Sequence, residues 1–289
     1  MQLAALAHLI RLPLALMVAA TALAGAVALR APLAGLTLWA IGWGVFLLAA
    51  ASSVLNQVQE RTSDALLRRT CQRPLACGLL TPAAGTALGL LLASGGLAVL
   101  LAGTAPAPAL LGLLALVWYL AVYTPLKRLT PLAVLAGTPC GAVPPLLGWL
   151  AAGGPLPAPQ PFAIALFMLL WQVPHYWLLS MPAKEELHSA GFRVLPALSE
   201  RQLLALCHRW LLGLALATLL LPALDLPAHP ILQGMIGGLA LALAITATWY
   251  WRKPLFPVQT ARRLRSALHL YLALVLLILM TDGLLFMTS

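Results

Sequence analysis

Charged side chains are scarce in this sequence. Asp, Glu, Lys and Arg together make up 8% of its 289 residues, against about 25% in an ordinary soluble domain, and hydrophobic residues make up 62%. That balance excludes a soluble globular protein. A membrane-spanning helix needs about 20 mostly apolar residues, so the chain has room for many spans and for little else. We expect residues 1–289 to form one transmembrane domain.

Cysteines and several common chemical motifs are also few or missing. The four cysteines, Cys71, Cys77, Cys140 and Cys207, form no C-x-x-C pair, so we expect neither a disulfide framework nor a structural zinc site. The phosphate-binding string G-x-x-x-x-G-K-[ST] does not occur, and ATP-driven work therefore has no support in the sequence. The six histidines lack the close spacing of a histidine-based metal centre.

What the sequence does contain is a series of apolar runs, separated by charged or Pro/Gly-rich breaks. Most of these runs are long enough to cross a membrane as a helix. The sequence therefore predicts an all-α integral membrane protein built as a bundle of nine transmembrane helices. We place the helices near residues 10–29, 34–55, 83–102, 106–122, 131–152, 161–181, 206–224, 230–250 and 267–287.

The basic residues predict the orientation of this bundle. With nine spans, the N-terminus and the even-numbered loops share one side, and every Lys and Arg except Arg30 falls there. Loops rich in Lys and Arg stay in the cytoplasm, so we expect the N-terminus and the long loops there, in a bacterial inner membrane. The net charge of +10 then needs no nucleic-acid partner. A signal peptide is the alternative for the first 25 residues, but the apolar run from Leu12 to Leu29 has the length of a span.

The acidic residues are so few, seven in all, that their positions carry information. Asn56, Glu60 and Asp64 recur every four residues at the end of the second predicted span. They project from nearly one face if the helix continues beyond the membrane. An amide and two carboxylates are oxygen ligands that suit Mg²⁺, which completes its shell with water and substrate phosphates. A solvated helix end with ion pairs between neighbouring turns is the alternative.

Further charges on the same side suit a bound diphosphate. A metal-bound diphosphate needs carboxylates for the metal and cations for the remaining phosphate charge, and the planar fork of Arg matches phosphate oxygens. The sequence therefore predicts a metal–diphosphate site at the cytoplasmic rim. Its additional candidates are Arg68, Arg69 and Arg73 after the second span, Tyr123, Lys127 and Arg128 after the fourth, and Lys184, Glu185 and Glu186 after the sixth.

One histidine lies at membrane depth. His175 belongs to the string WQVPHYW, residues 171–177, inside the sixth predicted span. An ionisable residue inside a membrane is a candidate functional residue by default, and Pro174 before it is expected to bend the helix and free backbone carbonyl groups. Packing among the neighbouring aromatic residues is the alternative.

Four strings along the chain resemble one known family. They are NQVQERTSDALLRRTCQRPL (56–75), YTPLKRLTPLAVLAGTPCGAVPPLLGW (123–149), WQVPHYW (171–177) and AGFRVLP (190–196). In this order they resemble the heme O synthases, a branch of the UbiA-type intramembrane prenyltransferases with nine helices. The resemblance runs from the second span to the loop after the sixth, and beyond about residue 205 only the hydropathy matches.

The resemblance implies transfer of a farnesyl group from farnesyl diphosphate to a vinyl group of heme b, with addition of water to give heme O. It places Asn56 and Asp64 on the Asn and the last Asp of the family motif N-x-x-x-D-x-x-x-D. Glu60 and Glu186 stand where the family has Asp, and Ala183 and Leu187 stand where it often has Tyr. Glu is one methylene longer than Asp and is still an oxygen ligand.

We therefore expect Mg²⁺ bound by Glu60, Asp64 and Glu186, with heme b as a substrate rather than a cofactor. The expected partners are farnesyl diphosphate, heme b, the lipid bilayer and a downstream heme-modifying or oxidase-assembly protein. Two rival functions stay open at this point: a UbiA-type enzyme acting on an aromatic or quinone precursor, and a heme-binding membrane protein without full catalysis. The candidate catalytic residues are Asn56, Glu60, Asp64, Tyr123, Lys127 and Glu186, and the candidate substrate-binding residues are Arg68, Arg69, Arg73, Arg128, Trp171, Gln172, His175, Lys184 and Glu185.

Overall fold

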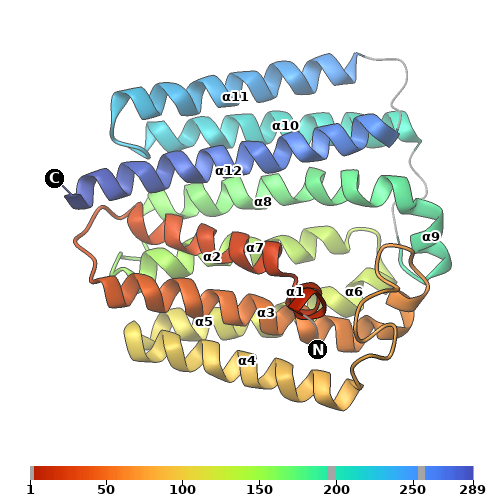
Figure 1. Cartoon of the computed structure of the whole chain (residues 1–289). Helices are drawn as coiled ribbons and strands as arrows, with labels where there is room; N and C mark the ends of the chain where they lie inside the picture. The colour runs from red at the N-terminus through yellow and green to blue at the C-terminus, as the bar shows by residue number, and fades with distance from the viewer. Residues whose placement is uncertain (1–2, 194–198, 253–257, 289) are drawn as a thin grey trace.

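The described part of the chain is a helical bundle. A computed structural model describes residues 3–193, 199–252 and 258–288, and these contain helices and turns but no strand. The string at 190–196 therefore lies partly outside the described residues. The helices are α1 (Leu3–Ile10), α2 (Leu12–Val27), α3 (Gly35–Ala65), α4 (Pro82–Gly103), α5 (Pro106–Val117), α6 (Thr124–Leu129), α7 (Ala133–Ala151), α8 (Pro159–Ser180), α9 (Lys184–Ser189), α10 (Glu200–Ala223), α11 (Pro230–Trp251) and α12 (Val258–Thr288), shown in Figure 1.

The number of spans agrees with the sequence pattern. Eight helical stretches in the described residues are long and apolar enough to cross a membrane, and the bent pair α1 and α2 brings the count to nine. The prediction of an all-α membrane bundle is therefore confirmed. Most of the observed helices begin and end within a few residues of the predicted runs. Pro stands in the first turn of α4, α5, α8 and α11 and favours a helix start there, because its missing N–H costs nothing at that position.

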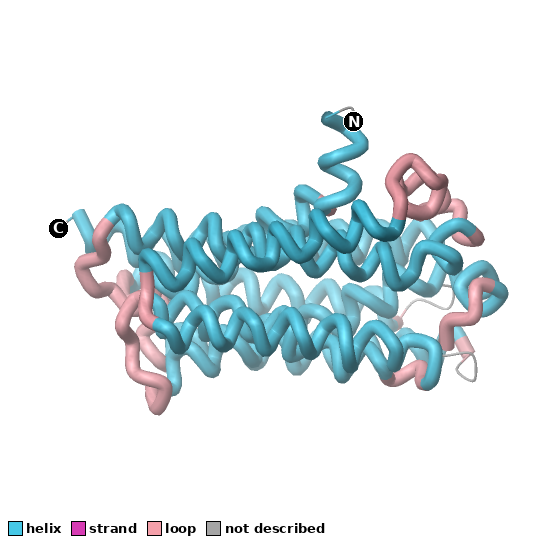
Figure 2. The backbone as a smooth tube through the Cα atoms, turned by 90° about the horizontal axis from the view of Figure 1, so that it is seen from below, coloured by secondary structure: helices cyan, strands magenta, loops and turns pink. Residues whose placement is uncertain are grey.

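The first span differs from the single helix that we expected over 10–29. Its chain bends by 50° between α1 and α2, and Figure 2 shows α1 standing off the bundle. The break is at Arg11, whose φ of 51° and ψ of 55° place it in the left-handed region. Pro13 follows in the first turn of α2, where it favours a new helix start. Gln57 Nε2 donates a hydrogen bond of 2.6 Å to the Leu9 carbonyl oxygen, which fixes α1 on α3.

The helices approach one another closely at one end of the bundle, which is called the outer end because the basic residues predict that it faces away from the cytoplasm. Helix α2 packs on α3, α7 and α12, and α8 packs on α7, α10 and α12. Near their outer ends α2 and α7 come very close, so that a side chain at Gly148 would collide with the carbonyl oxygen of Ala22. This approach needs glycine, and it leaves the space between the same helices open toward the other end.

The outer end is held by one buried ion pair. Arg30 Nε lies 2.9 Å from Asp282 Oδ2, and the Asp282 carboxylate also accepts hydrogen bonds from the backbone N–H groups of Ala228 and His229. Arg30, which the positive-inside pattern leaves on this side, thus has its charge neutralised within the protein.

Candidate active site

Helix α3 continues beyond the apolar run that predicted it. It extends to Ala65 and thereby carries Asn56, Glu60 and Asp64 on one face. All three residues are buried, with at most 5% of the residue surface exposed, and all three line a pocket of about 720 Å³. The spacing of four residues thus produces a row of oxygen ligands inside the protein rather than on a solvated helix end.

Each buried carboxylate faces a cation from another segment. Lys127 Nζ on α6 lies 2.7 Å from Glu60 Oε1, and Arg73 Nη1 in the 66–81 loop lies 2.6 Å from Asp64 Oδ2. Asn56 Nδ2 donates a hydrogen bond of 3.1 Å to Thr124 Oγ1, which leaves its amide oxygen available. The 66–81 loop and α6 therefore converge on the acidic row of α3.

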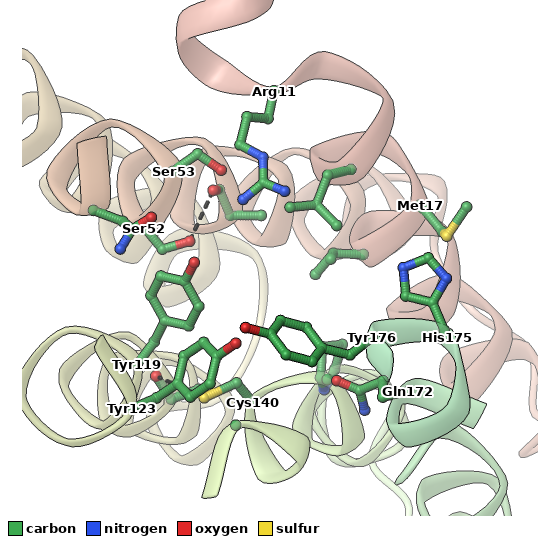
Figure 3. Close-up of a pocket in the computed structure, with 18 of the residues that line it drawn as sticks. Arg11, Met17, Ser52, Ser53, Tyr119, Tyr123, Cys140, Gln172, His175 and Tyr176 are labelled. Atoms are coloured by element: carbon green, nitrogen blue, oxygen red, sulfur yellow. Dashed lines mark hydrogen bonds between the residues drawn. The ribbon is translucent and has the colours of Figure 1, made fainter. Parts of the chain in front are cut away.

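Three tyrosines form the next layer of the pocket. Residues Trp118–Tyr123 form a π-helical turn between α5 and α6, a feature that often marks functional sites. The turn places Tyr119 and Tyr123 on the pocket wall together with Tyr176, and the hydroxyl groups of Tyr123 and Tyr176 are directed toward each other (Figure 3). Lys127 Nζ lies 4.9 Å from the Tyr123 ring centroid, within the range of a cation–π contact.

Glycines of α7 make room for these side chains. A Cβ at Gly137 would lie 2.6 Å from the Tyr123 ring, and a Cβ at Gly141 would collide with the Gln172 amide. Gln172 Nε2 donates to the carbonyl oxygens of Thr138 and Met168 at 3.1 and 3.0 Å. These glycines are therefore needed for the shape of the pocket.

Much of the remaining lining is apolar. A pocket with an acidic and basic rim and an apolar interior suits an amphipathic ligand with an anionic head. The apolar lining comes from α2, α3, α5, α7 and α8, and includes Leu14, Met17, Val45, Leu48, Leu116, Leu147 and Met168.

Most but not all of the predicted site residues meet in this pocket. Those that line it are Asn56, Glu60, Asp64, Arg69, Arg73, Tyr123, Lys127, Trp171, Gln172 and His175. Arg68, Arg128, Lys184 and Glu185 are not among its lining residues. Arg68 and Glu185 are exposed, and Arg128 Nη2 donates to Ser63 Oγ at 3.1 Å.

Glu186 lies beside the main pocket rather than in it. Its Oε1 accepts a hydrogen bond from the backbone N–H of Arg68, and it lines a neighbouring hollow of about 60 Å³ with Arg69 and Tyr176. Among the described side chains, no three from His, Cys, Asp and Glu lie close enough together to hold a metal ion. Glu60 and Asp64 thus share the pocket, while the expected third carboxylate is engaged with the backbone of the 66–81 loop.

The sequence did not assign several residues of the pocket to the site. Those with charged or aromatic side chains include Arg11, Tyr119, Tyr176, Arg265 and His269. In the sequence, Arg11 and Arg265 contributed only to the predicted orientation, and His269 lacks the close spacing to another histidine that would have indicated a metal site. Tyr119 lies four residues before Tyr123, and this helical spacing was the one local signal that was available.

The pocket carries crowded positive charge around Arg69. Partial burial, followed by the nearby guanidinium groups of Arg73 and Arg11, lowers the pKa of Arg69 below its usual value. Arg stays protonated in proteins, so the shift reports a guanidinium that is destabilised first by burial and then by neighbouring cations, and a bound anion would offset both effects. Arg11 reaches into the pocket from the bend between α1 and α2 (Figure 3).

Comparison with known proteins agrees with this architecture. The sequence profile of the UbiA prenyltransferase family matches residues 15–263. The chain belongs to the UbiA prenyltransferase family. Among curated UbiA relatives, a protoheme IX farnesyltransferase of Geobacter sulfurreducens is 48% identical over 196 residues, which cover 66% of this chain and 71% of the relative. A protoheme IX farnesyltransferase of Nitratidesulfovibrio vulgaris is 35% identical over 283 residues, which cover 96% and 94%.

Solved UbiA structures share the fold. A UbiA homolog from Aeropyrum pernix K1 matches with a TM-score of 0.76 at 21% identity, over 95% of this chain and 98% of that one. A UbiA homolog from Archaeoglobus fulgidus, bound to GPP and Mg²⁺, matches with a TM-score of 0.68 at 16% identity, over 99% and 100%. The helical bundle described above is thus the UbiA fold.

Proposed function

We propose that this UbiA family member transfers the farnesyl group of farnesyl diphosphate to a vinyl group of heme b, giving heme O. One observation supports prenyl transfer as the reaction class. The buried pairs Glu60–Lys127 and Asp64–Arg73 line the same pocket as a large set of apolar side chains. The names of the curated relatives, protoheme IX farnesyltransferase, support heme as the acceptor.

The acidic row fits Mg²⁺. Asn56 Oδ1, Glu60 and Asp64 offer an amide oxygen and two carboxylates, and Mg²⁺ in proteins is bound by one or two carboxylates plus substrate phosphates. Lys127 Nζ forms an ion pair with Glu60 Oε1, but the angles of this contact are not those of a hydrogen bond. Within the described residues, Glu60 Oε1 therefore accepts no hydrogen bond. When bound, Mg²⁺ would neutralise part of the diphosphate charge. Glu186 contributes indirectly by fixing the 66–81 loop at Arg68.

The cations of the rim stabilise the leaving group. The allylic C–O bond of farnesyl diphosphate breaks with its electron pair going to the diphosphate, and Arg11, Arg69, Arg73 and Lys127 are placed to bind the developing anion. Preorganised charges of this kind act strongly in a water-poor site. Because Lys127 and Arg73 already lie beside the carboxylates of α3, little reorganisation of these cations is needed as charge develops.

The aromatic layer then faces the allylic cation. The rings of Tyr119, Tyr123 and Tyr176 line the pocket next to the rim, and aromatic faces attract cations. The vinyl group attacks the farnesyl carbon, forming the C–C bond and leaving a cation on the carbon next to the porphyrin ring. Water adds to that carbon and loses a proton, which gives the hydroxyethylfarnesyl group.

Heme extraction from cells that produce the protein tests the proposal. We expect a new, more hydrophobic heme with the mass of heme b plus a farnesyl group and water. Its amount should fall in cells that produce Asp64→Asn. A prenylated phenol in place of that heme would support the rival acceptor, and unmodified heme bound to the purified protein, with no prenylated product, would support the rival without catalysis.

A further inference from the structure

A cluster of rings and a cation lies on the wall of the pocket where α8 meets α12. The rings of Trp171 and His175 are stacked with centroids 4.7 Å apart, and the rings of His175 and His269 are nearly perpendicular, with centroids 4.6 Å apart and an angle of 87° between the planes. Arg265 lines the same pocket one turn before His269. The chemistry of diphosphate departure uses none of these four side chains.

The backbone orients His269 for binding a metal. Its Nδ1 lies 2.9 Å from the carbonyl oxygen of Arg265, and a carbonyl oxygen can only accept a hydrogen bond. Nδ1 therefore carries a proton, so in the neutral ring Nε2 carries the free lone pair that a metal would take. Histidines that bind metals commonly donate their other ring N–H to a backbone carbonyl in this way. Trp171 Nε1 fixes the neighbouring turn by donating a hydrogen bond of 2.8 Å to the Leu268 carbonyl oxygen.

His175 is placed to support His269 rather than to share its ligand. Its ring contacts the rings of Trp171 and His269, and its Nδ1 is buried and lacks a hydrogen-bond partner within the described residues. Two imidazoles on opposite faces of one iron would have centroids about 6 Å apart, because each nitrogen lies about 2 Å from the metal. The perpendicular rings at 4.6 Å do not fit that arrangement, so one histidine at a time can bind the iron.

Arg265 adds a carboxylate-binding group beside the iron ligand. Residues four apart on a helix are neighbours, so the Arg265 guanidinium and the His269 ring lie on the same face of α12, and both line the pocket. The guanidinium fork suits a carboxylate. A metal ligand next to a carboxylate-binding cation suits a metalloporphyrin that carries propionate groups.

We propose that His269 binds the iron of the acceptor heme through Nε2, that Arg265 pairs with a heme propionate, and that His175 is a positioning residue for His269. The identity of the acceptor rests on the proposed function. The acceptor is thus bound by α8 and α12, while α3, α6 and the 66–81 loop bind the diphosphate.

Equilibrium titration of the purified full-length protein in detergent separates these roles. The probes are ferric heme b, metal-free protoporphyrin IX and the dimethyl ester of ferric heme b. For His269→Ala we expect heme affinity to fall about tenfold or more, unchanged protoporphyrin affinity, and recovery of the bound-heme absorption band on adding imidazole. For Arg265→Gln we expect a loss of about tenfold for heme and for protoporphyrin, with no loss for the dimethyl ester.

Two further variants complete the test. His208→Ala is the matched control, because His208 also lies in a membrane helix and stacks on a Trp, Trp251, away from the pocket lining; its heme affinity should be unchanged. His175→Ala should weaken heme binding less than His269→Ala. The proposal is overturned if His269→Ala binds heme normally, if it loses heme and protoporphyrin equally, or if only His175→Ala shows the metal-selective loss. Failure of the wild-type protein to bind any porphyrin would instead refute the acceptor named under the proposed function.

Discussion

At the residue scale, the two buried carboxylates of the pocket add little to the stability of the bundle. Removing an ion pair from water costs free energy that the attraction between the charges only partly returns, and an apolar pair would pack at least as well. The pairs Glu60–Lys127 and Asp64–Arg73 therefore indicate a functional need for charge at this position.

Neutralising either acid tests that interpretation. Asp64→Asn and Glu60→Gln keep the size of the side chain and remove its charge, so each is expected to lower turnover about 100-fold or more while the folded protein remains in the membrane. Turnover should also be lost on chelation and return with Mg²⁺. Glu185→Gln, at an exposed position outside the pocket, is the control with near-normal turnover. Near-normal rates for both pocket variants would contradict the metal site.

Arg11 and Arg30 offer a matched pair, because both have positive φ, 51° and 53°. Glycine removes the cost of this conformation, about 1–2 kcal/mol for other residues. Arg11→Gly should therefore keep or raise the melting temperature in detergent, yet weaken binding of farnesyl diphosphate about tenfold. Arg30→Gly breaks the ion pair with Asp282, so it should lower the melting temperature and leave diphosphate binding unchanged. Normal diphosphate binding by Arg11→Gly would remove Arg11 from the site.

At the element scale, the parts of the site that follow a helical period could be predicted and the rest could not. The four-residue spacing of Asn56, Glu60 and Asp64 defines a face as soon as the helix continues, and α3 does continue to Ala65. The π-helical turn at 118–123 inserts one extra residue into a turn, and no local pattern marks it. The same holds for the contact of α8 with α12, because the pairing of His175 with His269 depends on packing between segments far apart in the chain.

The glycines of α7 provide a test at this scale. Gly137→Ala should displace the Tyr123 ring, since a Cβ there would lie 2.6 Å from it, and the displacement should lower kcat while diphosphate binding stays within a few-fold of normal. Gly234→Ala is the matched control, because nothing lies within 4 Å of a Cβ at Gly234 on α11. Alanine favours helix by up to about 1 kcal/mol, so this control should be neutral or slightly stabilising. Equal kcat values for both variants would contradict a role for Tyr123.

At the scale of the whole molecule, hydropathy predicted the spans well because a membrane leaves the backbone few alternatives to a helix. The bend in the first span escaped prediction, since it depends on the left-handed conformation of Arg11 and on the bond from Gln57 to Leu9. The two ends of the bundle also differ in chemistry. Cations and acids gather around the pocket at one end, whereas the other end holds the neutral pair Arg30–Asp282.

This asymmetry predicts the orientation in the membrane. Every Lys and Arg except Arg30 lies in the N-terminal segment, in the connections α3–α4, α5–α7, α8–α10 and α11–α12, or in the helix ends that flank these connections. Segments rich in these residues stay in the cytoplasm. Reporter fusions at residues 104, 156 and 227 should therefore report the outer side, and fusions at 78, 130 and 190 the cytoplasm. The pocket rim would then open to the compartment that supplies soluble diphosphates. Because each added or missing span inverts every later loop, a cytoplasmic signal from any two of the first three fusions would refute the nine-span topology together with the placement of the diphosphate site.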